Sequence, residues 1–269
     1  MPKSLEELTF TDDGMFQAVL HEPEICAKLI ERLLHVNVSH VAYPELEKPI
    51  APFFTTKGIR LDVYLKDQDK IIDVEMQSYP MDFIGKRTRY YEAMIDMDTL
   101  MKGEDYTKLK DSYILFICKE DPFKNDKQLP FGLPCYSFRN MCCENNTVNF
   151  HDNSLKVIYN ASAYEKEEDL KIRKFLHYVY TNDPGDDDFT RQLSEIVNKL
   201  KDDEKFRGNY AAMNLHDRDI RVAAMREATE QKAIESAIIL IKDYNATPEV
   251  AAAKMGAPLD KVLEAISAK

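Results

Sequence analysis

The sequence predicts an α/β domain followed by a helical C-terminal region. Two stretches that alternate between apolar and polar residues, 60–66 and 71–77, are typical of paired β-strands. Two apolar runs, 112–118 and 155–160, indicate buried strands of the same domain. Beyond residue 163 almost every segment has helical spacing, so the rest of the chain is expected to be helical.

The N-terminal part of the chain is expected to form two helices. Apolar residues recur at helical spacing through residues 13–36, and Pro23 divides the stretch because proline fits the first turn of a helix but not its interior. Prolines at positions 44, 49 and 52 then predict an irregular crossing between these helices and the first strand.

The two alternating stretches should form a β-hairpin, because turn-forming residues connect them at 67–70. If Lys66 faces Ile71 across the turn, the numbers of paired residues sum to 137, and Asp62 lies directly opposite Glu75. Two carboxylates that face each other across a ladder repel unless a cation lies between them. The same face is expected to carry Arg60, Tyr64, Asp73 and Gln77.

This pair of carboxylates suggests a magnesium site. Mg²⁺ takes oxygen ligands and usually binds one or two carboxylates together with waters and substrate phosphates. Asp62, Glu75 and the backbone carbonyl of Met76 would supply such a partial shell, which suits phosphodiester hydrolysis. The alternative is that these residues form the solvated face of an antiparallel hairpin, neutralised by Arg60 and Lys66.

Helices follow the hairpin and fill the C-terminal region. A helix over residues 83–101 should end at Gly103 as its C-cap. A final unit begins at Thr247, a good N-cap followed by Pro248 in the first helical position, and its second short helix begins at Pro258. Helical spacing predicts three longer helices between residue 163 and this unit, at 165–180, 189–200 and 219–244.

Charge and composition exclude several classes of protein. A net charge of −11 argues against a general nucleic-acid coat protein, although a local basic strip beside an acidic site remains compatible with it. The absence of a glycine-rich phosphate loop disfavours an ATPase. No apolar run approaches the roughly 20 residues of a bilayer span, and the first residues do not resemble a secretory signal, so we expect a cytosolic protein without a membrane partner.

Several ordered motifs resemble one family. Asp62, followed after twelve residues by Glu75-Met76-Gln77, is similar to the D...ExK core of PD-(D/E)XK nucleases in the variant where glutamine replaces the lysine. With the runs at 59–63, 73–77, 86–91 and 102–106, the chain resembles the Rpn-type recombination-promoting nucleases, also described as PD-(D/E)XK nuclease family transposases. The resemblance begins near residue 8 and reaches at least Tyr180.

The resemblance implies a mixed central β-sheet flanked by helices, with a restriction-endonuclease-like core. We assign residues 1–163 to this nuclease-like domain, 164–218 to a helical extension, and 219–269 to a long helix with a small helix-turn-helix-like unit. The implied activity is that of a metal-dependent DNA endonuclease using Mg²⁺, or Mn²⁺ as an alternative. Its implied role is in DNA recombination or transposition, or in defence against foreign DNA in bacteria. The alternative is a catalytically weak or inactive member that acts as a DNA-binding or protein-interaction module.

Roles for single residues follow from the same resemblance. Asp62 and Glu75 would be metal ligands, and Gln77 would occupy the lysine position, where it can orient a water but adds no charge. Asp13, at the start of the first helix, matches an acidic residue of the family and would contact the metal through water. The usual aromatic-lysine pair in that helix reads Phe16-Gln17 here, so any phosphate contact from that lysine is missing.

Contacts with DNA are expected beside the metal. Arg87 and Tyr91 lie four residues apart and share one helix face, with Lys86 next to them, and Arg60 lies on the strand of Asp62. For Arg87 the alternative is a solvated helix surface with the aromatic residues packed on the sheet. The C-terminal helical pair is interpreted as a docking or homodimer-forming unit, because its lysines are balanced by acidic residues.

Overall fold

The computed structural model of the protein describes residues 3–38, 44–50, 58–67, 69–244 and 246–267. Pro52 and Gln68, which belong to the expected crossing and turn, lie outside these residues. The chain forms two compact units, Lys3–Glu204 and Lys205–Lys269, and each is described by itself. The first unit extends past residue 163, where the nuclease-like domain was expected to end. Among the described residues, no helix is long and apolar enough to cross a membrane.

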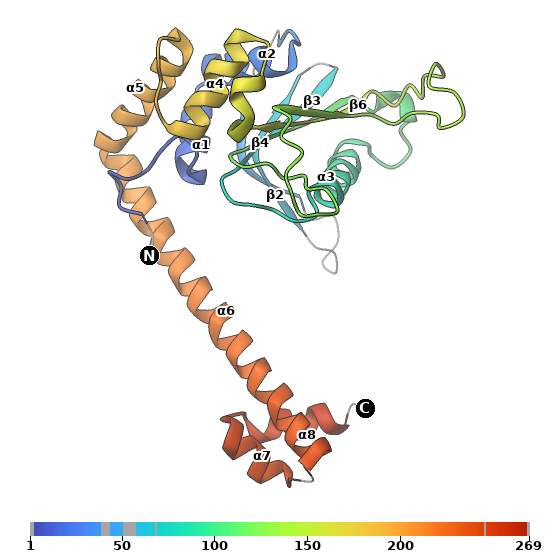
Figure 1. Cartoon of the computed structure of the whole chain (residues 1–269), viewed down its shortest axis with the longest axis vertical. Coiled ribbons are helices and arrows are strands. Elements are labelled where there is room, and N and C mark those ends of the chain that lie inside the picture. Colours follow the sequence, from blue (N-terminus) through green and yellow to red (C-terminus); the bar gives the residue numbers. More distant parts are fainter. Residues whose placement is uncertain (1–2, 39–43, 51–57, 68, 245, 268–269) are drawn as a thin grey trace. The chain divides into compact units, whose positions relative to one another are not determined.

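The first unit is built on a six-stranded sheet in the order β1-β2-β3-β4-β6-β5 (Figure 1). The pairs β3–β4 and β4–β6 are parallel, and the other three pairs are antiparallel. This confirms the expected mixed sheet. The strands are β1 (Glu45–Ile50), β2 (Ile59–Lys66), β3 (Lys70–Gln77), β4 (Asp111–Cys118), β5 (Cys135–Phe138) and β6 (Ser154–Asn160).

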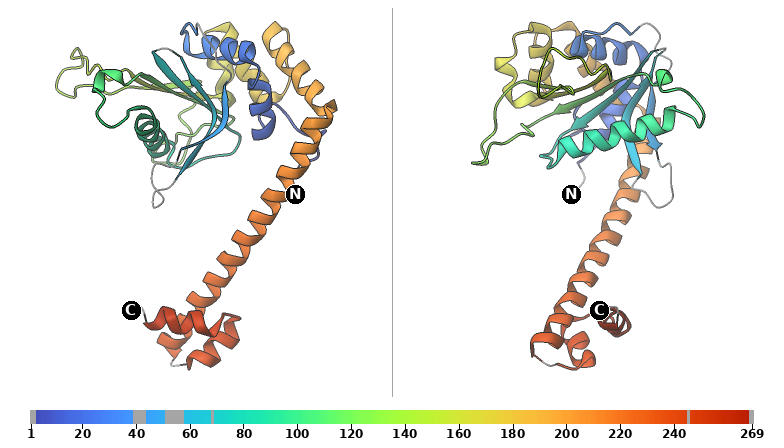
Figure 2. Two further views of the ribbon diagram at one scale, coloured as in Figure 1. Left: turned by 180° about the vertical axis from the view of Figure 1, so that it is seen from behind. Right: turned by 90° about the vertical axis from the view of Figure 1, so that its right-hand side faces the viewer.

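Helices cover both faces of the sheet (Figure 2). One face carries α3 (Ile84–Thr99), and the other carries α1 (Asp13–Leu20), α2 (Pro23–Leu34), α4 (Leu170–Thr181) and α5 (Asp188–Asp202). Short 3₁₀ turns lie at Tyr106–Lys108 and Ala161–Lys166. Buried apolar side chains of α3 and of all six strands form the α3-side core, which includes Leu61, Tyr64, Ile71, Ile84, Tyr91, Phe116, Tyr136 and Ile158.

The helix boundaries follow local sequence signals. Pro23 stands in the first turn of α2, as expected, and His35 ends that helix in the left-handed region. The carboxylate of Asp169 accepts hydrogen bonds from the first backbone N–H groups of α4 and so fixes its start. The helix expected from residue 165 therefore begins later, at Leu170. Asn182 ends α4 in the left-handed conformation, which asparagine tolerates.

Three expectations for the secondary structure were wrong. Part of the irregular crossing is strand β1, which tolerates Pro49 because an edge strand does not need every backbone N–H. The short strand β5 was not expected at all. The third long helix, α6 (Glu204–Tyr244), starts about 15 residues earlier than residue 219 and runs for 41 residues.

The second unit contains α6 together with α7 (Pro248–Met255) and α8 (Leu259–Ser267). The Thr247 side chain accepts a hydrogen bond from the Val250 N–H, and Pro248 follows at the start of α7, as expected. Gly256 closes α7 with a φ of +68°, a value that favours glycine. The buried core of the unit consists of three alanines, Ala237, Ala251 and Ala252, together with Ile234 and Val262.

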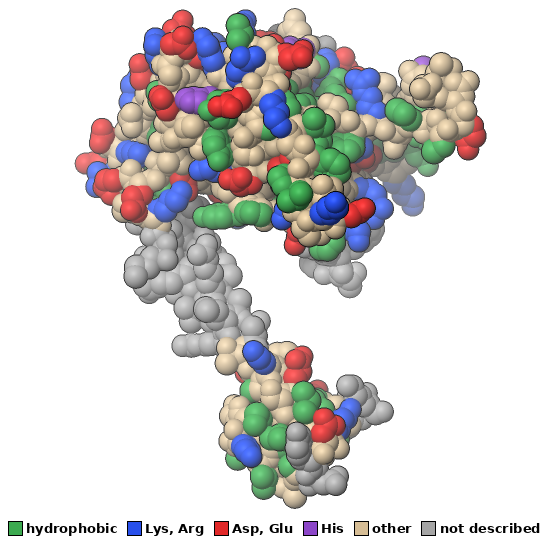
Figure 3. All heavy atoms as spheres, viewed as in Figure 1, with side chains coloured by type: hydrophobic (Ala, Val, Ile, Leu, Met, Phe, Trp, Pro, Cys, Tyr) green, Lys and Arg blue, Asp and Glu red, His purple; other side chains and the backbone are tan. Residues whose placement is uncertain are grey.

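The surface of the first unit carries charges of both signs. Figure 3 shows acidic and basic side chains interspersed over one face, with hydrophobic side chains gathered around the region of α3. The excess of acidic residues in the whole sequence therefore does not describe every part of the surface.

Candidate metal centre

Asp62 and Glu75 come together where the β2–β3 ladder ends. The ladder runs from Lys66–Ile71 to Val63–Val74, so the expected register, in which paired numbers sum to 137, is confirmed. Beyond the Val63–Val74 pair, hydrogen bonds from the backbone to the two carboxylates take the place of backbone pairing. The Asp62 N–H donates to Oε1 of Glu75 at 2.9 Å, and the Met76 N–H donates to Oδ2 of Asp62 at 3.2 Å.

The strand changes its facing at Asp62. Strict alternation would put Leu61 and Tyr64 on opposite faces, yet both belong to the α3-side core. On the other side of the strand, the pairs Lys48–Leu61 and Leu46–Val63 flank Glu47, whose φ of 52° lies in the left-handed region. The expected separation of faces therefore fails at this point, because the backbone near Asp62 departs from regular pairing with both neighbours.

The carboxylates of β3 are not part of a solvated face. Glu75 is 1% exposed, and Asp73, two residues before it on the same face of β3, is 0% exposed. Both are buried because α3 covers this side of the sheet. Both oxygens of Asp73 lack a hydrogen-bond partner among the described residues. The alternative of a wet hairpin face neutralised by Arg60 and Lys66 is therefore wrong. Arg60 instead contacts Glu47 on the neighbouring strand, at 3.6 Å.

Arg87 of α3 is the positively charged side chain that contacts Glu75. Its Nη2 donates to Oε2 of Glu75 at 2.8 Å, and its Nε donates to the Tyr91 hydroxyl at 2.7 Å. The guanidinium also lies over the rings of Tyr91 and Phe116, at 4.9 and 5.4 Å from their centroids. Arg87 is thus a partly buried residue held against Glu75 and Tyr91, and the alternative of a fully solvated helix surface is wrong for it.

Gln77 and Gln17 occupy the two positions at which the family resemblance suggests lysine. The Gln77 carboxamide donates to the carbonyl of Tyr79 at 2.6 Å and accepts from Nη1 of Arg87 at 3.4 Å. Gln17 of α1 donates to Oδ1 of Asp62 at 3.4 Å, a contact that sequence reasoning did not anticipate. Neither side chain brings a positive charge. The positive charge that lysines would bring at these positions comes instead from Arg87.

The acidic groups of the site disfavour one another's ionisation. Burial, together with the charge of Asp13, raises the pKa of Asp62 to about 6. Burial and the nearby Asp62 raise the pKa of Glu75 to about 8, since they outweigh the attraction of Arg87. Burial, followed by the charges of Glu75 and Asp62, raises the pKa of Asp73 well above its usual range. The pKa of Asp13 is also raised, first by burial and then by Asp12.

The expected DNA-contacting residues divide into two groups. Lys86 and Arg60 are exposed, and Lys86 lies over the ring of Phe83 at 5.1 Å. Arg87 and Tyr91 face the interior and support Glu75. The sequence reasoning missed Asp73 as a member of the acidic cluster, because an alternating pattern does not reveal whether a helix covers the charged face.

The donor set fits a divalent cation that keeps part of its own shell. The described residues contain no group of three or more histidine, cysteine, aspartate or glutamate side chains arranged to hold a metal. The buried Glu75 and the partly buried Asp62 at one ladder end nevertheless match what Mg²⁺ usually takes from a protein, the remainder being water and phosphate. Burial, with the neighbouring carboxylates, raises the pKa of both Asp62 and Glu75, so a bound cation would favour their ionised forms.

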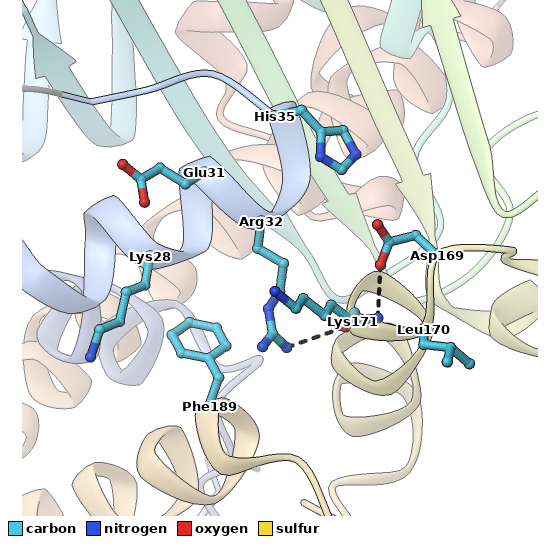
Figure 4. Close-up of a pocket in the computed structure, with 8 residues that line it drawn as sticks. All are labelled: Lys28, Glu31, Arg32, His35, Asp169, Leu170, Lys171 and Phe189. Carbon is cyan, nitrogen blue, oxygen red and sulfur yellow. Dashed lines mark hydrogen bonds between the residues drawn. The ribbon is translucent and has the colours of Figure 1, made fainter.

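A separate cavity of about 600 Å³ lies on the other side of the sheet, among α2, α4 and α5 (Figure 4). Its central cation, Arg32, forms a two-pronged contact with Asp187 at 2.8 and 3.2 Å and donates to the carbonyl of Lys171. The guanidinium also lies over the Phe189 ring, at 4.6 Å. These contacts join three helices, so Arg32 has a structural role there.

Comparison with known proteins identifies the family. No curated protein and no solved structure matches the chain. Residues 15–232 match the family described as PD-(D/E)XK nuclease family transposase. The match extends well beyond Tyr180 and contains both carboxylates of the ladder end, while Asp13 lies two residues before it. Because it covers most of the sequence, the chain belongs to the PD-(D/E)XK nuclease family transposases.

Proposed function

We propose that the protein is a metal-dependent DNA endonuclease that hydrolyses phosphodiester bonds at Asp62 and Glu75. The observation that carries this proposal is the meeting of these two carboxylates at the end of the β2–β3 ladder, where each accepts a hydrogen bond from the opposite strand. Mg²⁺ is the proposed ion and Mn²⁺ the alternative, because a set of carboxylate oxygens suits such hard cations.

The chain's own residues have distinct roles in this proposal. Asp62, Glu75 and the carbonyl of Met76 would hold the ion, which when bound would polarise the phosphate and make its water a better nucleophile. Arg87 keeps the Glu75 carboxylate in position. Gln77 donates one carboxamide N–H to the carbonyl of Tyr79, which leaves its second N–H to orient a water. Asp13 adds negative charge next to Asp62.

The exposed cations Arg60 and Lys86 are proposed to contact the phosphates of the DNA backbone, because both lie on elements that carry the site. Arg87 and Tyr91 are proposed to act indirectly, through Glu75. Cleavage of this kind would serve DNA recombination or transposition, as the family's description suggests, or defence against foreign DNA.

One observation favours a second function, that of a weak or silent family member that binds DNA or protein. Arg87 already donates to Oε2 of Glu75 at 2.8 Å, so a metal must compete with an existing contact. The second unit, with Ile239 and Val250 exposed, is proposed as the docking or homodimer-forming part. Light scattering on the full chain would establish whether it is a dimer.

Plasmid cleavage tests the proposed activity. The purified protein should cut DNA in Mg²⁺ or Mn²⁺ and stop when a chelator is added. Glu75→Gln should abolish cutting, since it removes a ligand charge with little change of shape. The matched control is Glu120→Gln, which changes an exposed carboxylate just after β4. Cutting by purified Glu75→Gln at the parent rate would refute the proposed site.

A further inference from the structure

A cavity of about 410 Å³ lies between α3 and the β6–β5 end of the sheet. Its floor includes Ile158, which belongs to the α3-side core, and Phe123, which packs against that core. The cavity therefore opens on the face of the sheet that also carries Glu75 and Arg87. Its size falls in the range of small-ligand pockets, roughly 300–1,000 Å³.

The cavity wall carries an excess of positive charge. Arg89 of α3, Arg139 just after β5 and Lys156 of β6 line it, with Glu92 as the carboxylate among its lining residues. Glu92 pairs with Lys156 at 2.7 Å. Within the described part of the chain, neither Arg89 nor Arg139 forms an ion pair, and both are exposed. Two uncompensated guanidinium groups in a protein of net charge −11 indicate an anionic ligand.

The same wall carries an aromatic surface. Phe138 of β5 is 45% exposed, and its ring lies 5.4 Å from the ring of Phe123, which in turn contacts Tyr136 at 4.7 Å. Phenyl rings and guanidinium planes are the groups on which nucleic-acid bases stack. A nucleotide unit, which joins a planar base to a charged phosphate, matches both features of this wall.

The position of the cavity fits a DNA strand that also reaches the carboxylates Asp62 and Glu75. β6 lies two strands from β3 and β5 lies three, which corresponds to about 10 and 14 Å at the usual strand spacing. Successive nucleotides of a stacked strand are about 3.4 Å apart. A base in the cavity would therefore lie roughly three or four nucleotides from the phosphate at Glu75.

We propose that this cavity binds one unpaired base of the DNA strand, a few nucleotides from the bond that is cut, with Phe138 as the stacking surface and Arg89 and Arg139 as contacts to the flanking phosphates. The inference rests on the proposed nuclease function. It assigns to the protein a preference for DNA with an unpaired stretch beside the cleavage point.

The test is binding of labelled single-stranded DNA to the full chain in a chelator, so that no cleavage is required. One abasic site is moved through the oligonucleotide, and the dissociation constant is measured at each position. For the parent protein one position should weaken binding by roughly tenfold, which is within the range expected for loss of one stacked base. In Phe138→Leu, which keeps apolar packing but loses the ring, that position effect should disappear.

Matched controls separate base stacking from general attraction. Phe150→Ala removes an aromatic residue that is 68% exposed and does not line the cavity, and Lys127→Gln removes an exposed charge elsewhere. Both should keep the position effect, while the double variant Arg89→Gln/Arg139→Gln should weaken binding at every position. Equal affinity at all abasic positions would overturn the base pocket even if the protein cuts DNA. A clear position effect without any cleavage in metal would overturn the nuclease proposal alone.

Discussion

Arg87 offers the sharpest test of how the acidic cluster is held in the fold. Replacing it with glutamine removes the 2.8 Å ion pair with Glu75, whose carboxylate is 1% exposed. Removing one partner of a fully buried pair costs about 3–5 kcal/mol. The Arg87 side chain is 34% exposed, so solvent screens part of this, and we expect a loss of about 2 kcal/mol.

The assay is thermal unfolding of the full chain without metal. For a unit of this size, about 2 kcal/mol corresponds to a fall of roughly 4–8 °C in Tm. Lys86→Gln is the matched control, because it removes the same charge one residue away and does not contact Glu75; its change should stay within about 0.5 kcal/mol. Glu75→Gln in the Arg87→Gln background should recover part of the loss, since the buried charge is then absent. An Arg87→Gln protein with the parent's Tm would refute the reasoning.

Three further predictions concern the metal, the pH and the missing lysine. Divalent metal should raise Tm by mass action, by about 2.7 kcal/mol at 100 times the dissociation constant, and Asp62→Asn should show a smaller rise; equal rises would place the ion elsewhere. Because folding raises the pKa of Glu75 from 4.5 to about 8, the folded state holds the proton more tightly, so the free energy of unfolding of the metal-free protein should fall as pH increases through this interval. Since ligands must be deprotonated, the metal-induced rise in Tm should be larger at about pH 9 than at about pH 6, and thermal scans at both values would contradict this if the rise were equal. Gln77→Lys alone should lower stability because it sets a second cation beside Arg87. Arg87→Gln should lose plasmid cleavage together with the support of Glu75, and Gln77→Lys in that background should restore it; if cleavage stays absent in the double variant, charge at this point is not what the site requires.

The hairpin and its register could be predicted from the sequence because they depend on local alternation and turn chemistry. The pairs Tyr64–Asp73 and Lys66–Ile71 occur as expected. The pairing of Arg87 with Glu75 could not be predicted, because it depends on how α3 lies across the sheet. The burial of Asp73 was missed for the same reason.

The two edge strands were missed for other physical reasons. Proline at position 49 is a signal against a strand, and it is tolerated only because β1 pairs on one side. Strand β5 has four residues, which is too short for a periodic pattern to appear. Its place in the sheet is determined by antiparallel pairing with β6, a contact between segments about 20 residues apart.

The composition of these edges affects how the molecule behaves at high concentration. An exposed edge strand is a template on which another chain can add its own strand and start an aggregate. In β1 the ring of Pro49 removes one backbone donor, and the left-handed φ of Glu47 turns the backbone away from a regular row. β5 offers only four residues. Replacing Pro49 by valine would lengthen the regular part of the edge, so the cost would be expected in solubility during expression rather than in the stability of the single molecule.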